Sequence, residues 1–325
     1  MKTFSIIVPV YQNRANLGET VPRLLALADR LPGYRLELVM VDDGSTDGSR
    51  EMLANLAREH PESIRAVFLT RNFGQSPAIQ AGLRHATGDC IGIISCDLQE
   101  PCEEFAAMVK LWEQGHKYVL GERVDRREST THQATSSFYW WIVRRFAFRE
   151  FPPMGYDFCL LDRQIAEELS AINEKNTSIF VLIYWLGHHP RRLPIVREVR
   201  TKGRSQWNLQ RKIGFTLDTL IGFTYVPARL ISLLGFGTAL LAMLYLGIVL
   251  VRWFVHQAAP PGWMTVVGLV TLLGALNLFA LGILSEYLLR ILDEARKRPP
   301  YIVDYVITPP QRDAGKARHG QCSFT

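Results

Sequence analysis

The chain has few of the features that mark disulfide-stabilised, zinc-binding or secreted proteins. Its 325 residues include five cysteines (Cys90, Cys96, Cys102, Cys159 and Cys322), and none shows the paired spacing of a metal site. An odd number of cysteines favours free thiols in a reducing compartment. Residues 1–10 hold one lysine and a short apolar run without a cleavage-site pattern, unlike a signal peptide. We therefore expect roughly the first 200 residues to stay in the cytoplasm.

The chain also lacks a strong charge of one sign. Its formal net charge is +6, and the basic residues gather near two apolar segments. That distribution suits the head groups of anionic lipids better than nucleic acid. We expect no nucleic-acid partner.

Charge is missing altogether from two long runs, residues 230–251 and 264–285, of 22 residues each. A helix of that length crosses a hydrocarbon core of about 30 Å. Two buried helices of a soluble protein are the alternative, but such runs seldom occur in tandem. The pattern favours a membrane hairpin.

The flanking charges predict how that hairpin is oriented. The loop at residues 252–262 carries a single basic residue, Arg252. The positive-inside rule then places both outer ends in the cytoplasm. The outer basic residues are Arg211, Lys212 and Arg229 before the first run, and Arg290, Arg296, Lys297 and Arg298 after the second.

Strand and helix patterns alternate in the first hundred residues. Strands are predicted at 4–10, 36–41, 66–69 and 90–95, and helices at 19–31, 49–60 and 76–86. This rhythm predicts an α/β fold with a mostly parallel sheet. Ligands bind at the carboxyl ends of the strands in such sheets, and polar clusters follow all four predicted strands.

Two of these clusters have competing interpretations. Asp42 could bind a nucleoside, or it could belong to a turn and helix cap in the run Asp-Gly-Ser-Thr-Asp-Gly. Ligand contact is favoured, since capping needs only Ser45 or Thr46. Asp97 and Gln99 place two oxygen-bearing side chains on one side of an extended segment, where they could share a divalent cation with a diphosphate. A plain surface loop is the alternative.

Together, the stretches SIIVPVYQN, VMVDDGSTDGS, RNFGQ and CDLQEP resemble the family 2 inverting glycosyltransferases, whose nucleotide-sugar-binding domain is of the GT-A type. The later GYDFCLLDR, VRTKGRSQW and SEYLLRILDEARKRPPYIV resemble the polyprenyl-phosphate glycosyltransferase branch. That branch includes dolichyl-phosphate mannose synthase and bactoprenol glucosyltransferases. Members with two C-terminal membrane helices are the most similar, and the resemblance covers nearly the whole chain.

The resemblance implies a role for each matching position. Asp97 and Gln99 would hold Mg²⁺ or Mn²⁺ against the donor diphosphate. Asp157 would act near the acceptor, as a base or as an orienting group, with Asp97 as the second catalytic carboxylate. The donor-binding positions would be Pro9, Tyr11, Asp42, Arg71 and Ser95, and the acceptor-phosphate positions Arg123, Arg126, Arg200, Ser205 and Gln206.

Three positions depart from the family pattern. Ser95 stands where the first acid of an Asp-x-Asp pair is usual, which removes one charge from the metal site. Asn13 replaces a usual glutamate. Gln206 replaces a frequent lysine, which removes a cation from the acceptor-phosphate segment.

Two segments outside the membrane runs, residues 138–148 and about 207–225, suit a lipid acceptor. Residues 138–148, FYWWIVRRFAF, combine aromatic and arginine side chains that favour the membrane interface. Packing of this helix against the sheet is the alternative. The predicted domains are therefore a glycosyltransferase domain at 1–205 with an interfacial helix at 138–150, a juxtamembrane helix at 206–227, two membrane helices at 228–290 and a tail at 291–325.

The resemblance implies transfer of a hexose, with inversion, from a nucleotide sugar such as UDP-glucose to polyprenyl (undecaprenyl) phosphate, for cell-envelope glycan modification. It places a multi-pass protein in the bacterial inner membrane, with a cytoplasmic catalytic domain and a homo-oligomer, a tetramer, as its assembly. A processive polysaccharide synthase is less consistent, since a Q-x-x-R-W segment and further spans are lacking. A catalytically impaired membrane scaffold is the other alternative.

Overall fold

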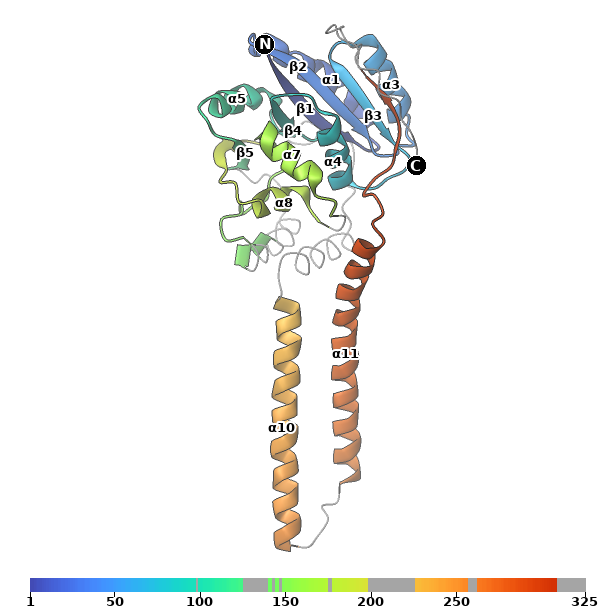
Figure 1. Cartoon of the computed structure of the whole chain (residues 1–325), viewed down its shortest axis with the longest axis vertical. Coiled ribbons are helices and arrows are strands. Elements are labelled where there is room, and N and C mark those ends of the chain that lie inside the picture. The colour runs from blue at the N-terminus through green and yellow to red at the C-terminus, as the bar shows by residue number, and fades with distance from the viewer. Residues whose placement is uncertain are drawn as a thin grey trace, which may run out of the picture. The chain divides into compact units, whose positions relative to one another are not determined.

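The strands form one eight-stranded sheet of order β7-β5-β6-β4-β1-β2-β3-β8 (Figure 1). The computed structural model describes residues 1–97, 99–124, 140–141, 144–145, 148–174, 177–197, 226–256 and 262–308. The strands are β1 (Lys2–Val10), β2 (Tyr34–Asp42), β3 (Ile64–Leu69), β4 (Cys90–Ile93), β5 (Tyr118–Arg123), β6 (Cys159–Asp162), β7 (Arg191–Ile195) and β8 (Val303–Ile307).

The four predicted strands are present and parallel to one another, as expected. The predicted fourth strand was too long, because β4 ends at Ile93. Two strands run opposite to the rest: β6 pairs antiparallel with β4 and β5, and β8 pairs antiparallel with β3. The first residues of β6 therefore lie at the edge of the sheet where β4, β5 and β7 end.

Helices cover both faces of the sheet. They are α1 (Arg14–Leu25), α2 (Leu27–Arg30), α3 (Ser49–Glu59), α4 (Gln75–His85), the 3₁₀ turn η1 (Cys102–Glu104), α5 (Phe105–Glu113), α7 (Arg163–Ala171) and α8 (Ile179–Trp185). The helix predicted at 19–31 is two helices, α1 and α2, and it begins earlier, at Arg14.

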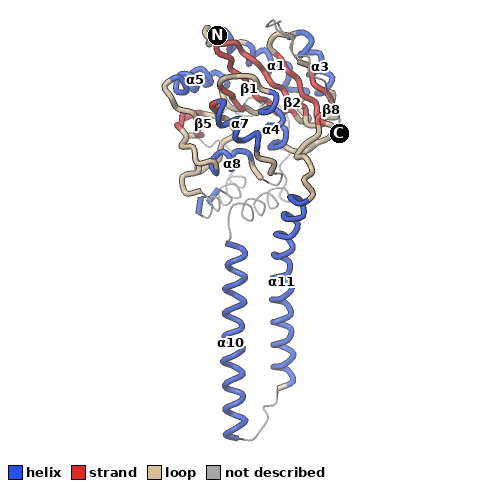
Figure 2. Tube along the Cα trace, viewed as in Figure 1, coloured by secondary structure: helices blue, strands red, loops and turns tan. Residues whose placement is uncertain are grey.

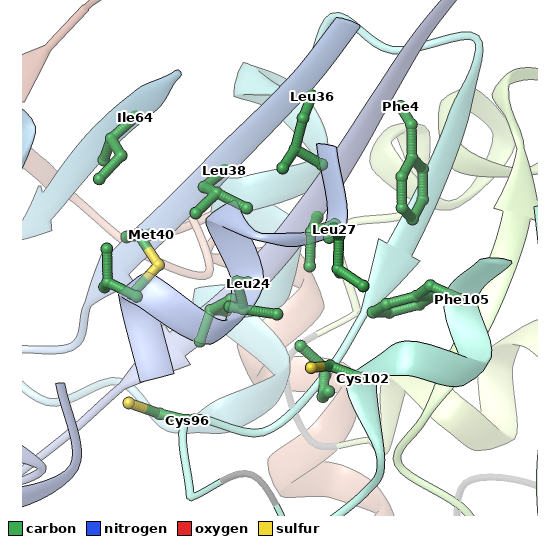
Figure 3. Close-up of a cluster of buried hydrophobic side chains, with 14 of the residues drawn as sticks. Phe4, Leu24, Leu27, Leu36, Leu38, Met40, Ile64, Cys96, Cys102 and Phe105 are labelled. Atoms are coloured by element: carbon green, nitrogen blue, oxygen red, sulfur yellow. The ribbon is translucent and has the colours of Figure 1, made fainter. Parts of the chain in front are cut away.

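Alternating residues of the central strands fill two cores. Ile6, Val8 and Met40 belong to one buried cluster with residues of α1, α3 and α5. Figure 3 labels Met40, Leu24 of α1 and Phe105 of α5 among its members. Ile7 and Val41 point to the other face, where α4 lies against the sheet. A Cβ at Gly82 of α4 would lie 2.5 Å from Ile7 Cγ2, so only glycine permits this approach. Burial on both faces explains why these strands are continuous apolar runs.

The two uncharged runs form long helices, α10 (Val226–His256) and α11 (Trp263–Ala295), drawn as two long blue coils in Figure 2. Each contains a window long and apolar enough to span a membrane, with mean hydropathy of 1.6 and 2.0, and none of the described side chains in either window is buried. Length and composition alone support this interpretation. Of the interfacial predictions, almost all of 206–227 and about half of 138–150 fall outside the described residues.

The chain divides into two compact units in a way the sequence did not suggest. One unit comprises Met1–Thr130, Met154–Ser205 and Pro300–Thr325, and the other Thr131–Pro153 and Gln206–Pro299. The predicted tail at 291–325 thus contains part of the first unit, because Val303–Ile307 pairs with β3 as strand β8 (Figure 1).

Candidate active site

Hydrogen bonds join the loops that follow β1 and β2. The Gln12 backbone N–H donates to Ser45 Oγ (3.1 Å), and its side-chain amide donates to Thr46 Oγ1 (2.8 Å). Gln12 has a φ of +53°, a left-handed conformation that is uncommon outside glycine and that these contacts hold in place. Pro9 and Tyr11, both predicted donor-site residues, are half-buried beside this connection.

The adjacent carboxylates Asp42 and Asp43 organise the loop after β2. Asp42 is completely buried, accepts a hydrogen bond from the Ser45 N–H (3.3 Å) and pairs with Arg50 (3.4 Å). Burial raises its pKa despite these contacts. The arrangement has the turn-forming contact of the alternative interpretation, so a nucleoside contact by Asp42 stays a prediction.

Asp43 connects the loop after β2 to the loop after β3. Its carboxylate accepts hydrogen bonds from the backbone N–H groups of Phe73 (2.7 Å) and Gly74 (2.8 Å), and burial raises its pKa to about 6. At Gly44, with φ of +69°, a Cβ would lie 2.4 Å from the Arg71 carbonyl carbon. Arg71, predicted to contact the donor, is exposed, with its guanidinium 4.6 Å from the centre of the Phe73 ring.

Ser95, Asp97 and Gln99 lie half-buried in the loop after β4. Thr20 Oγ1 of α1 donates to the Cys96 carbonyl oxygen (2.7 Å), which fixes this loop against the first helix. The Gln99 N–H lies 3.5 Å from Asp97 Oδ1. No cluster of three or more acidic, histidine or cysteine side chains suited to a metal occurs in the described part of the chain. A metal here would need oxygens from the donor diphosphate and water as well.

A second group of charged side chains surrounds Asp157. Arg123, at the end of β5, donates to Asp157 and pairs with Glu100 (3.2 Å). Arg197, just after β7, lies 3.0 Å from Glu100 and 3.9 Å from Asp157. We call Glu100, Arg123, Asp157 and Arg197 the transfer cluster. Glu100 follows Gln99 directly, so the cluster adjoins the predicted metal segment.

The two carboxyl groups of the transfer cluster have opposite pKa shifts. Burial raises the pKa of Glu100, and the nearby charge of Asp157 adds to that effect. Burial would also raise the pKa of Asp157, but the charges of Arg123 and Arg197 outweigh it and lower that pKa. Asp157 is therefore held as a carboxylate, which makes it a weak proton acceptor.

Sequence reasoning found only half of this cluster. It assigned Asp157 and Arg123 but missed Glu100 and Arg197, although both lie inside or beside quoted motifs. No local pattern distinguishes Arg197 from its basic neighbours, since only the pairing of β5 with β7 brings it beside Arg123. Arg126, Arg200, Ser205 and Gln206 lie outside the described residues.

The side chains of the four described cysteines belong to neither group. Cys90, Cys96, Cys102 and Cys159 are free and buried, which confirms the prediction of free thiols for the described cysteines. Burial raises the pKa of the Cys96 and Cys102 thiols to about 12, so both are protonated and unreactive at neutral pH.

Comparison with known proteins identifies the family of this chain. Residues 5–169 match the profile described as Glycosyl transferase family 2, a stretch that covers β1 to most of α7. The chain belongs to glycosyl transferase family 2. This membership makes the protein a glycosyltransferase and confirms the predicted family.

Relatives of this family 2 glycosyltransferase match along almost the whole chain. The glycosyltransferase YkcC of Bacillus subtilis is 31% identical over 301 residues, with 92% of this chain and 93% of the relative covered. The undecaprenyl-phosphate 4-deoxy-4-formamido-L-arabinose transferase of Pseudomonas syringae is 31% identical over 309 residues, with 94% and 91% covered.

A solved structure shares the fold of this family 2 glycosyltransferase. The glucosyl-3-phosphoglycerate synthase of Mycobacterium tuberculosis, in complex with phosphoglyceric acid, superposes with a TM-score of 0.51. The match has 17% sequence identity and covers 68% of this chain and 80% of the other. The predicted GT-A fold, a mostly parallel sheet with helices on both faces, is thereby confirmed.

Proposed function

We propose that the protein transfers a hexose from a nucleotide sugar, UDP-glucose or a similar UDP-hexose, to polyprenyl phosphate with inversion at the anomeric carbon. The observation that carries this proposal is the position of Asp157, held by Arg123 and Arg197 next to the Asp97–Gln99 segment. Two cations beside a half-exposed carboxylate suit an anionic acceptor. The name of the Pseudomonas syringae relative supports undecaprenyl phosphate as that acceptor.

A phosphate acceptor reduces the need for a general base at the site. A phosphate monoester has a second pKa near 6, so it is already a nucleophilic dianion at neutral pH. Its oxygen forms the new bond to the anomeric carbon while the bond to the nucleoside diphosphate breaks. Asp157, with its lowered pKa, is suited to orienting groups and balancing the arginine charges rather than to taking a proton.

The donor side would involve a divalent cation. Asp97 and Gln99 offer one carboxylate and one amide oxygen, the hard ligands that Mg²⁺ and Mn²⁺ prefer, so the donor set fits when diphosphate oxygens complete it. When bound, such an ion would neutralise charge on the leaving diphosphate. Ser95 adds only a hydroxyl, and we expect weaker metal binding than at a site with two acids.

The hairpin would keep the enzyme at its lipid substrate. α10 and α11 are long and apolar enough to cross a bilayer, and the positive-inside rule places their outer ends in the cytoplasm. We propose a multi-pass protein of the inner membrane with a cytoplasmic catalytic unit and a role in cell-envelope glycans. The tetramer implied by the resemblance stays a prediction.

The test is transfer by the full-length protein in lipid nanodiscs. Radiolabelled UDP-hexoses are supplied with Mg²⁺ or Mn²⁺ and with polyprenyl phosphate, polyprenol or no acceptor. We expect label in the organic phase only with the phosphate, loss of label with EDTA, and an inverted anomeric centre by NMR. Absence of lipid-linked label with every donor would reject the proposal and favour the membrane scaffold.

A further inference from the structure

The transfer cluster brings two carboxyl groups and two guanidinium groups into mutual contact. Arg123 and Arg197 each approach both carboxylates, and the two share one oxygen of Glu100, Oε1, at 3.2 and 3.0 Å. Both guanidinium groups also approach Asp157, and Asp157 shares a side-chain hydrogen bond with Glu100. Glu100 therefore fixes two cations at once.

The four side chains differ in depth. The Glu100 side chain is completely buried, whereas 16% of Arg123, 19% of Arg197 and 23% of Asp157 is exposed. Glu100 is thus the most deeply buried side chain of the cluster, and Asp157 is the most exposed. A substrate that enters from solvent would meet Asp157 and the arginines before Glu100.

The fold explains why these residues meet. Glu100 follows β4, Arg123 ends β5 and Arg197 follows β7, all at the carboxyl edge of the sheet. Asp157 precedes β6, which is antiparallel and therefore begins at that same edge. Arg123 is in register with Ile195, and the Val124 N–H donates to the Ile195 carbonyl (3.1 Å), which sets β5 beside the segment that carries Arg197.

Burying four ionisable side chains together is an unfavourable way to stabilise a fold. Apolar side chains of similar volume often stabilise a core as well as a buried ion pair does, or better. The cluster also lies where open α/β sheets place their ligands. Both considerations favour a role in the reaction over a purely structural one.

We propose that Glu100 and Arg197 are positioning residues for glycosyl transfer: Glu100 anchors Arg123 and Arg197 so that both guanidinium groups flank Asp157 where the acceptor phosphate reacts. This inference rests on the proposed function of the site. A guanidinium group carries five N–H donors, so each arginine can contact a carboxylate and a phosphate together. Arg197 thereby becomes a second cation of the acceptor site.

The experiment compares variants of the full-length protein in nanodiscs. Arg197→Ala, Arg197→Lys and Glu100→Gln are measured against the controls Arg192→Ala of β7 and Glu122→Gln of β5, whose side chains form a separate ion pair (3.0 Å). Steady-state kinetics give kcat and KM for polyprenyl phosphate and for the donor. Calorimetry gives the Kd for UDP, and thermal unfolding gives the stability of each variant.

We expect Arg197→Ala to lower kcat/KM for polyprenyl phosphate by about tenfold or more, with the Kd for UDP and the unfolding temperature close to those of Arg192→Ala. Arg197→Lys should recover part of the loss. Glu100→Gln should lower kcat, and the double variant should lose less than the two single losses combined, because both act through one contact.

Three outcomes would overturn the proposal. If the wild type transfers sugar and Arg197→Ala and Glu100→Gln match their controls, the positioning role is wrong while the proposed function stands. The same holds if UDP binding and stability fall in parallel with activity, which indicates a structural role. If the wild type transfers nothing to polyprenyl phosphate, the proposed function is wrong. This inference is then wrong as well, because it rests on that function.

Discussion

At the scale of single residues, the proposed mechanism depends most on Asp157. Asp157→Asn keeps the volume of the side chain but removes the charge that faces Arg123 and Arg197. We expect kcat to fall by about a hundredfold or more, since misplaced cations at a reacting phosphate are costly. The Kd for UDP should stay unchanged, because the predicted donor-binding residues lie in or near the loops that follow β1 to β4, whereas Asp157 precedes β6. Turnover like that of the wild type would remove Asp157 from the mechanism.

A second residue-scale prediction concerns acid stability. Glu103 accepts two hydrogen bonds from Arg23 of α1 (2.8 and 2.9 Å), and these lower its pKa to about 2. A carboxyl group whose pKa falls on folding stabilises the protein above its unfolded pKa. That stabilisation is lost as the pH falls from about 4.5 to about 2.

Glu103→Gln should therefore lower the free energy of unfolding by about 1–2 kcal/mol at pH 7 and by much less near pH 2.5. Denaturant unfolding of the detergent-solubilised chain, followed by tryptophan fluorescence at both pH values, measures the difference. Glu104→Gln is the control, because no ion pair of Glu104 is found among the described residues. Equal losses at both pH values would contradict the assignment.

At the scale of elements, β8 is an edge strand contributed from beyond the apolar hairpin. Tyr305 stacks on Phe68 of β3 with ring centres 4.3 Å apart. The guanidinium of Arg50 lies 5.2 Å from each ring, and Arg50 pairs with Asp304 as well as with Asp42. The strand therefore supports the loop that follows β2 through a single arginine.

Tyr305→Ala should destabilise the first unit by about 1–2 kcal/mol, because it removes the stacked ring and its cross-strand packing. Tyr305→Phe keeps the ring and should unfold like the wild type. Thermal unfolding of the full chain compares the three proteins. If the alanine variant is as stable as the phenylalanine variant, β8 does not stabilise the sheet.

At the scale of the whole molecule, we propose that the apolar hairpin holds the enzyme at a membrane. Leu244 lies within α10 and is 58% exposed, as a lipid-facing residue would be. Arginine near the middle of a span costs about 2.5–3.5 kcal/mol on insertion scales. We expect Leu244→Arg to shift protein out of the carbonate-resistant membrane fraction and Leu244→Ala to leave it there. An unchanged distribution of Leu244→Arg would argue against a membrane span.

The local parts of this architecture could be predicted from the sequence. Strands β1 to β4 and helices α3 and α4 were predicted within a few residues, because burial on two faces makes continuous apolar runs and amphipathic helices leave a regular pattern. The two uncharged runs likewise predicted the long helices α10 and α11. The polar residues after β1, β2 and β4 indicated the edge where the site lies.

The sequence by itself thus determined the fold class, the family resemblance, the apolar hairpin and the edge of the sheet that carries the chemistry. Only the tertiary structure decided that β6 and β8 run antiparallel, that residues after the hairpin return to the sheet, and that Glu100 and Arg197 join Arg123 and Asp157. The physical reason is the range of the interactions. Periodicity and capping act between residues near in sequence, whereas strand pairing and buried ion pairs join residues tens to hundreds of positions apart, and no local pattern records them.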